Sequence, residues 1–286
     1  MSDEMTILLQ QADAVGARIF EFFRYLGSLG LLVYLSFRAT IFGSTEGHTH
    51  VKKYGLRQVF SVVSAQIYFT GWQALPMITV LALAAGGIAI LQSSAQLSLF
   101  GGTGMLGSIL VITIVREMGP LITALIVIAR SGAAVASEIG NMRVHREIEA
   151  LEVMGINPLS YIVFPRVAGG VISVVCLAFY FNAISLVGGF FVSRAIHDLP
   201  FSFYFESLAN AFVIEDIILF FVKNGFSGLM IFALACHQGL SVKLSSHEVP
   251  QVTTKAVVHS IIAVTSFNVV VSVIFYVKQL VRMGIL

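Results

Sequence analysis

The sequence predicts an all-α integral membrane protein with about five transmembrane helices. Charged residues make up 11% of the 286 residues, whereas a soluble globular domain carries about 25%. The hydrophobic fraction is 57% and the mean hydropathy is +0.90. A helix needs roughly 20 apolar residues to cross the hydrocarbon core of a bilayer. The apolar runs of that length cover residues 73–91, 105–129, 167–192, 217–236 and 256–277.

Two segments precede the first of these runs. Residues 17–42 are apolar at helical spacing but contain four charges, so we expect a helix that lies in the membrane interface. One interpretation makes residues 55–72 half of a re-entrant hairpin, which residues 73–91 complete after a bend at Pro76. The sequence therefore predicts an N-terminal cytoplasmic or interfacial helix within residues 1–50 and a membrane domain at residues 51–286.

The distribution of basic residues predicts the orientation of the helices. Cytoplasmic connections are enriched in Lys and Arg. The basic residues in alternate connections are Lys52, Lys53, Arg57, Arg130, Arg143, Arg146, Arg166, Lys243 and Lys255. Five crossings then place the N-terminus in the cytoplasm and the C-terminus outside it. The net charge of +2 is too small to indicate binding to nucleic acid.

Residues 131–158 form a charged segment between the second and third apolar runs. Its apolar residues recur at steps of four, three and three, on one helix face: Val144, Ile148, Leu151 and Met154. The i,i+4 spacing also pairs Arg143 with Glu147, and His145 with Glu149. Gly155 is suited to end the helix in a left-handed conformation, and Asn157-Pro158 prevents continuation. Two interpretations stay open: a docking element for another protein, or a helix resting on lipid headgroups.

Three charged residues lie inside the apolar runs: Arg116, Glu117 and Lys223. A charge near the bilayer centre costs at least about 2.5–3.5 kcal/mol, so such a residue usually faces a cavity or a partner. Adjacent helical residues diverge by about 100°, so Arg116 and Glu117 cannot simply neutralise each other. We expect Glu117 to pair with Lys223, either at a binding pocket or as a purely structural pair. Gly119 and Pro120 predict a bend or break in the second crossing, of the kind found beside cavities.

Short glycine patterns carry less information. No run ends in the Gly-Lys-Ser/Thr of a P-loop, so the sequence predicts no nucleotide site. Residues 102–107 match G-x-G-x-x-G, but outside a βαβ unit this pattern indicates a compact turn and close helix packing. Gly132, Ala136 and Gly140 recur every four residues and predict a face that lets another helix approach.

Three stretches carry a family resemblance. They read REMGPLITAL at residues 116–125, ARSGAAVASEIGNMRV at residues 129–144 and EALEVMGINP at residues 149–158. Together with Pro165-Arg166 and TTKAVVHS at residues 253–260, they resemble the MlaE (YrbE) family of ABC-transporter permeases. The resemblance covers about residues 56–277, and residues 1–50 match weakly. It implies that residues 51–286 form an MlaE-type permease domain.

The resemblance also implies partners. Members of the family are the membrane subunits of lipid transporters that work with MCE-domain proteins. It therefore implies a homodimer of permeases, two cytoplasmic ABC ATPase subunits and MCE proteins on the periplasmic side. ATP and Mg would bind to the ATPase, and this chain would hold no cofactor or metal. Residues 138–155 match the coupling helix, which is seated in the ATPase. Its expected contributors are Glu138, Met142, Arg143, Arg146, Glu147, Ile148, Leu151, Glu152 and Met154.

The function that the resemblance implies is a lipid permease of the cell inner membrane, moving phospholipids between that membrane and an MCE conduit toward the outer membrane. Family positions matching Arg116 and Glu117 lie at or near a lipid pocket, with Gly119 and Pro120 beside it. An apolar pocket with a few cations, Lys223 included, suits a phospholipid with an anionic headgroup. Two aromatic residues line this pocket or, in the preferred interpretation, anchor the membrane interface: Tyr68 and Trp72.

Three other classes of protein compete with this interpretation. One, an intramembrane enzyme, would need a nucleophile and a base or clustered metal ligands, which the histidines do not form at readable spacing. An ion-coupled secondary transporter usually shows two related halves and several intramembrane carboxylates, whereas Glu117 stands nearly alone in its apolar run. A non-transporting membrane scaffold would explain a docking helix but not the buried ions. The sequence predicts a transporter subunit, not an enzyme.

Overall fold

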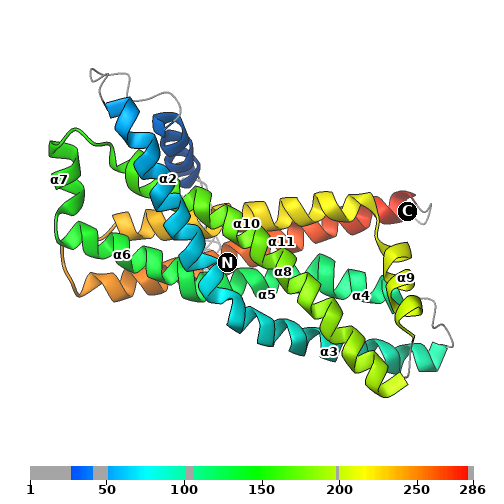
Figure 1. The fold of residues 1–286 in the computed structure, drawn as a ribbon. Helices are drawn as coiled ribbons and strands as arrows, with labels where there is room; N and C mark the ends of the chain where they lie inside the picture. The colour runs from blue at the N-terminus through cyan, green and yellow to red at the C-terminus, as the bar shows by residue number, and fades with distance from the viewer. Residues whose placement is uncertain (1–26, 41–50, 101–105, 198–199, 283–286) are drawn as a thin grey trace, which may run out of the picture.

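The computed structural model describes residues 27–40, 51–100, 106–197 and 200–282. Within these ranges the chain is helical apart from short turns and contains no strand, which confirms the predicted all-α class. Figure 1 shows an elongated bundle, with helix α7 at one end and helix α9 near the other. We refer to these as the α7 end and the α9 end.

Five helical stretches of the described chain are long and apolar enough to cross a membrane, as predicted. They are Phe60–Ser93, Gly107–Val144, Leu159–Ala195, Ile214–Leu240 and Glu248–Arg282. Each overlaps one of the predicted apolar runs and extends beyond it. The second stretch has 38 residues, about 57 Å at 1.5 Å per residue, against a hydrocarbon core of about 30 Å. Its length therefore carries helix α6 (Ala133–Val144) toward the α7 end, past the apolar run.

The first stretch is a bent helix and not a hairpin. Helix α2 (Val51–Thr70) leads through Gly71 and a 3₁₀ turn, η1 (Trp72–Ala74), into α3 (Leu75–Phe100). Both helices pack against α8, and Figure 1 shows the chain changing direction at η1 without doubling back. The hairpin interpretation of residues 55–91 is therefore wrong. Proline in the first turn of α3 is tolerated because that N–H has no intrahelical partner.

The remaining helices complete the bundle and its two ends. Their bounds are α4 Leu106–Leu110, α5 Gly119–Val127, α7 Glu147–Val153, α8 Phe164–His197, α9 Phe201–Ala211, α10 Ile214–Leu240 and α11 Glu248–Arg282. The sequence did not predict α9, which lies across one end of the bundle (Figure 1). It is held there by Tyr204, whose hydroxyl donates to the carbonyl of Leu186 at 2.9 Å. Burial raises the pKa of the Tyr204 phenol, so it stays a donor at physiological pH.

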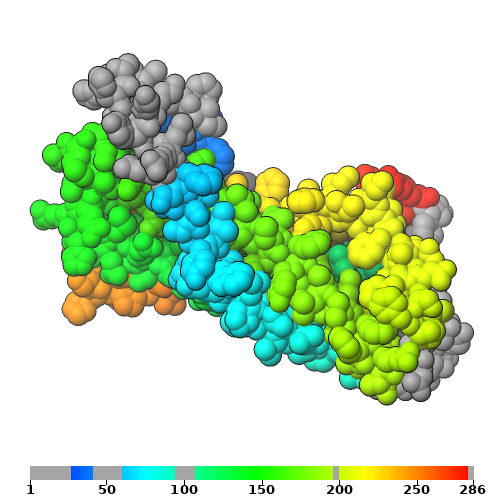
Figure 2. Space-filling view, in the orientation of Figure 1, coloured from blue at the N-terminus to red at the C-terminus, as the bar shows by residue number. Residues whose placement is uncertain are grey.

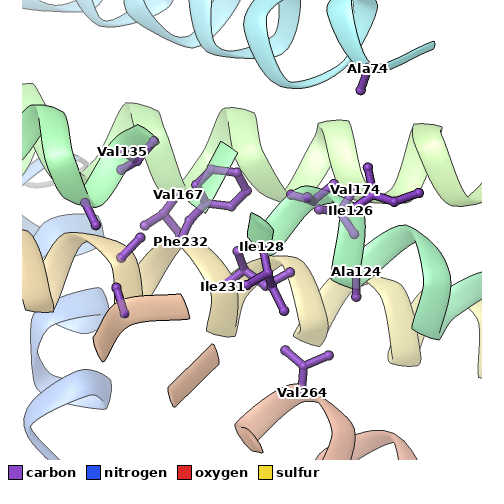
Figure 3. Close-up of a cluster of buried hydrophobic side chains, with 14 of the residues drawn as sticks. Ala74, Ala124, Ile126, Ile128, Val135, Val167, Val174, Ile231, Phe232 and Val264 are labelled. Atoms are coloured by element: carbon purple, nitrogen blue, oxygen red, sulfur yellow. The ribbon is translucent and has the colours of Figure 1, made fainter. Parts of the chain in front are cut away.

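Helix α8 is central to the packing and contacts α2, α3, α5 and α10. Figure 2 shows α2, α3 and α8 side by side on one face, with α9 closing the end. Part of the largest apolar cluster is drawn in Figure 3, where Val174 of α8 lies beside Ile126, Val167 beside Phe232, and Ile231 beside Ile128. This core holds the charged second stretch against α8 and α10.

Small residues bring the helices close together. A Cβ at Gly86 of α3 would lie 1.9 Å from the carbonyl oxygen of Ser185 on α8, so only glycine fits. The Ser185 hydroxyl donates to the carbonyl of Ala82 at 2.9 Å across the same contact. The predicted small-residue face of Gly132, Ala136 and Gly140 is where α10 packs on α6. There, Gly239 of α10 lies against the carbonyl of Ala136. Close approach of backbones is the usual basis of helix association in membranes.

The predicted N-terminal helix at residues 17–42 is described only from residue 27. Residues 27–40 are helical, and the Phe37 ring meets Phe164, at the start of α8, edge-on at 5.0 Å. Leu32 packs against the main apolar core. This helix therefore rests on the bundle near the first turn of α8. The rest of the segment lies outside the described residues, as do residues 102–105 of the glycine pattern.

Candidate functional site

The structure contains the intramembrane ion pair expected from the sequence. Lys223 Nζ on α10 lies 3.1 Å from Glu117 Oε2 on the second stretch. The ammonium also donates to the carbonyl of Arg116 at 2.6 Å and to Ser272 Oγ on α11 at 2.8 Å. Ser272 in turn donates to Glu117 Oε2 at 3.0 Å. Three helices thus converge on one carboxylate.

Arg116 has a separate partner that sequence reasoning missed. Its Nε lies 2.8 Å from Asp216 Oδ1, and its Nη2 donates to Asp216 Oδ2 at 3.3 Å. The guanidinium also lies over the Phe275 ring, 5.2 Å from the ring centroid. Asp216 lies just before the predicted apolar run at residues 217–236, but α10 begins at Ile214 and includes it. The available signal was the spacing of Asp216 and Lys223, seven residues or about two turns apart on one face.

The helix is unusually wide where these charges lie. Residues Val111–Met118 (η3) are π-helical, and the N–H of Gly119 donates to the carbonyl of Ile114. Such wide turns are rare and often occur at functional sites. The predicted bend or break at Gly119-Pro120 therefore takes the form of a widened but continuous helix. A Cβ at Gly119 would lie 2.0 Å from Asn182 Oδ1 on α8, so glycine permits this approach.

Tyr68 and Trp72 lie on the bent first stretch, whereas the charge cluster is formed by the second stretch, α10 and α11. Both aromatic side chains are exposed. Their exposed fractions are 58% and 64%. The neighbouring bend is fastened by Arg130 of the second stretch, which donates to the carbonyl of Phe69 at 3.1 Å and to Gln73 Oε1 at 2.8 Å. The Arg130 guanidinium also stacks over the Phe69 ring at 5.1 Å. The interfacial role of the two aromatic residues stays a prediction.

The charged segment 131–158 is not one helix. Helix α6 ends at Val144, Arg146 adopts a left-handed conformation with φ of 59°, and α7 covers only Glu147–Val153. The helix expected over residues 138–155 is thus divided, with Glu138, Met142 and Arg143 on α6. Sequence pattern could not predict this turn because arginine rarely adopts positive φ. The predicted ending is confirmed, since Gly155 has φ of 76°.

The turn changes which side chains meet. Arg143 pairs with Glu149 at 3.0 Å, and not with Glu147 as i,i+4 spacing predicted. Ile148 is buried and Leu151 packs on the main core, whereas Val153 and Met154 are 88% and 65% exposed. Ile148 and Leu151 therefore anchor one face of α7 to the core, and the opposite face is exposed on the surface. Val144, at the end of α6, packs on a small cluster formed by Val242, Val249 and Val252.

A cavity of about 450 Å³ lies beside α7. It is lined by Val62, Glu138, Asn141, Met142, Glu147, Tyr161, Ile162 and Arg166. Arg166 crosses from α8 to Glu138 of α6, with Nη2 2.6 Å from Oε1, and its Nη1 donates to the carbonyl of Ile162. This ion pair joins α6 to α8 next to α7.

The family model described as Permease MlaE matches residues 63–274. The chain belongs to the MlaE permease family. The matched residues contain the whole cluster of Arg116, Glu117, Asp216, Lys223 and Ser272, as well as α7. Family membership identifies the five membrane-spanning stretches as those of a permease.

Similar proteins cover nearly the same length. A probable ABC transporter permease protein of Rickettsia felis is 28% identical over 270 residues, 94% of this chain and 99% of that protein. One of Rickettsia bellii is 31% identical over 217 residues, 76% of this chain and 84% of that protein. The intermembrane phospholipid transport system permease protein MlaE of Haemophilus influenzae is 28% identical over 265 residues, 92% of this chain and 97% of that protein.

Proposed function

We propose that this chain is the membrane-spanning permease subunit of an ATP-driven ABC transporter that moves phospholipids between the inner membrane and an MCE-protein conduit. The observation that carries the proposal is the charge cluster within the apolar stretches of an MlaE permease. Each intramembrane charge costs about 2.5–3.5 kcal/mol or more on insertion scales, and such residues mark substrate paths. The names of relatives in Rickettsia and Haemophilus support the transporter class and the lipid cargo.

Helix α7 is the proposed contact with a separate ATPase, which would bind ATP and Mg and leave this chain without a cofactor. The exposed Val153 and Met154 form an apolar patch on a charged helix end, as a docking surface requires. The buried Ile148 transmits a push on that patch to the core. The Glu138–Arg166 pair then carries it to α8.

The proposed orientation places the α7 end in the cytoplasm and the α9 end in the periplasm, where an MCE-domain protein would bind. The alternation of basic connections along the sequence supports this orientation. It puts the N-terminus in the cytoplasm and the C-terminus in the periplasm. The lipid enters or leaves at the charge cluster between these ends.

A second copy of the chain completes the proposed permease. Helix α11 supports this, because only 17% of its most apolar window is buried, against 61% for the second stretch. Valine and isoleucine side chains cover its outer face, among them Ile262, Val270 and Ile274. That face suits lipid or an identical helix, and the family resemblance favours the homodimer.

Co-purification with the ATPase tests the proposal. The chain should bring down an ABC ATPase whose hydrolysis rises in phospholipid vesicles, and Val153→Asp should lower that stimulation at least tenfold. Thermal unfolding of the variant should match the unmodified protein, because Val153 is exposed. Glu206→Gln, an exposed change on α9 at the opposite end, serves as the control. Lipid movement driven by an ion gradient in the isolated chain would overturn the proposal, and an assembled complex that moves no lipid would indicate a scaffold.

A further inference from the structure

The cavity beside α7 lies at the depth of the lipid headgroups. The third apolar run begins at Val167, and three residues that line the cavity come within the six residues before it: Tyr161, Ile162 and Arg166. Six helical residues span about 9 Å. The headgroup region on each side of a bilayer is roughly 5–8 Å thick. The cavity is therefore at headgroup level in the leaflet on the α7 side, about 30 Å along the helix from Glu117.

The wall of this cavity carries an excess of negative charge. Two carboxylates line it, Glu138 and Glu147, against the single cation Arg166. Arg166 is buried and its charge is paired with Glu138 at 2.6 Å. Glu147 is exposed, and none of the ion pairs among the described residues includes it. The charge of Glu147 is therefore left without a counter-charge, and the cavity favours a cationic ligand.

The rest of the lining suits an ammonium group on a short hydrocarbon stem. The Asn141 amide oxygen is a further acceptor for N–H donors. An aromatic ring such as that of Tyr161 attracts a cation to its face. Val62 and Met142 contribute an apolar wall. The volume of about 450 Å³ falls within the range of about 300–1,000 Å³ that is usual for small-ligand sites.

We propose that this cavity binds the headgroup of a membrane phospholipid that ends in a primary ammonium group, which donates to the Glu147 carboxylate. Such a charge-assisted hydrogen bond is about twice as strong as a neutral one. A lipid is favoured over a side chain of a partner protein because the cavity lies at headgroup depth. Val62 belongs to α2, which lies on the outer face of the bundle in Figure 2, so the acyl chains can extend along that helix. The site requires only a membrane-spanning chain and does not depend on the proposed transport.

Carbodiimide coupling tests the contact directly. The reagent joins a carboxylate to a primary amine without a spacer, so only groups that touch react. The full chain is treated in nanodiscs of equal phosphatidylethanolamine, phosphatidylglycerol and phosphatidylcholine, and its peptides are analysed by mass spectrometry. We expect the ethanolamine lipid on Glu147 at least fivefold more often than on Glu206, an exposed carboxylate of α9 at the opposite end. Equal yields at the two residues would overturn the inference.

Lipid retention gives a second and independent measurement. Glu147→Gln should lower the phosphatidylethanolamine that remains on the purified chain at least fivefold relative to phosphatidylglycerol. Glu152→Gln, an exposed change on the same helix outside the cavity lining, should leave this ratio unchanged. Both variants should unfold at the temperature of the unmodified chain, because both side chains are exposed. If Glu147→Gln keeps the lipid but releases the ATPase from the complex, the occupant is a protein side chain and the inference is wrong.

Discussion

Glu117 and Lys223 form an ion pair of 3.1 Å across 106 residues of sequence, and their side chains differ sharply in exposure, at 30% and 1%. The Lys223 ammonium is sealed between three helices, whereas the Glu117 side chain is partly exposed. The two residues therefore do different work. Lys223 and Ser272 fix the orientation of the Glu117 carboxylate, and Glu117 supplies the counter-charge of the buried ammonium.

This difference predicts unequal costs for removing either charge. Glu117→Gln leaves a buried ammonium without a counter-charge and should destabilise the protein by about 3–5 kcal/mol. Lys223→Met removes the counter-charge of Glu117, but the Glu117 side chain is 30% exposed, so this change should cost less, about 1–3 kcal/mol. Thermal unfolding in detergent measures both. The double variant should be more stable than Glu117→Gln alone, and equal costs for the two single variants would contradict the assignment.

Asp216 should matter far more than its neighbour Glu215. Asp216→Asn strands the buried Arg116 charge and should cost about 3–5 kcal/mol, seen as a large drop in melting temperature. Glu215 pairs with Arg282 at the exposed surface, so Glu215→Gln should change stability by less than about 1 kcal/mol. Similar melting temperatures for the two variants would show that Arg116 does not depend on Asp216.

Two glycines of the bundle should respond in opposite directions to alanine. Gly86→Ala places a Cβ against the Ser185 backbone and should destabilise the α3–α8 contact by about 1–3 kcal/mol. A Cβ at Gly225 of α10 meets nothing within 4 Å, so Gly225→Ala should be neutral or stabilise the helix by up to about 1 kcal/mol. Unfolding curves of the two variants give the comparison. A well-tolerated Gly86→Ala would mean that α3 and α8 are less tightly packed than described.

Arg130 should control the rigidity of the bend between α2 and α3. Arg130→Lys keeps the charge but cannot span the Phe69 carbonyl and Gln73 at once, because lysine lacks the planar fork of arginine. Hydrogen exchange of residues 69–75 should speed up at least tenfold, while exchange in α10 stays unchanged. If hydrogen exchange at the bend is unaltered, Arg130 does not control the rigidity of the bend.

Residues 138–155 form two helices, α6 and α7, where the sequence pattern predicted one. The apolar spacing predicted one shared face for Ile148, Leu151 and Met154, but only Ile148 and Leu151 pack on the core, while Met154 is exposed; Gly155 ended the helix as expected. The positive φ at Arg146 was not predictable, because no local propensity favours it. With this turn, Ile148 packs in the core and Arg143 meets Glu149 in place of Glu147.

Asp216, in the intramembrane charge cluster, is a second residue whose role local sequence pattern did not predict. Asp216 precedes the predicted apolar run at residues 217–236, whereas α10 starts at Ile214 and turns Asp216 inward. Its Oδ2 also accepts the N–H of Val213 at 3.0 Å and so caps the helix. The same carboxylate therefore begins a helix and neutralises Arg116, and only the first role leaves a local signal.

The sequence by itself determined the all-α membrane class, the five crossings and the presence of ions that need partners, because length, hydropathy and charge are properties of single segments. Only the tertiary structure decided that Arg116 pairs with Asp216, that the first stretch bends at η1, and that Glu117 is the exposed charge of the cluster. Those outcomes depend on distances between residues far apart in the chain. Local spacing contains no information on such distances, and the packing of α8, α10 and α11 sets them.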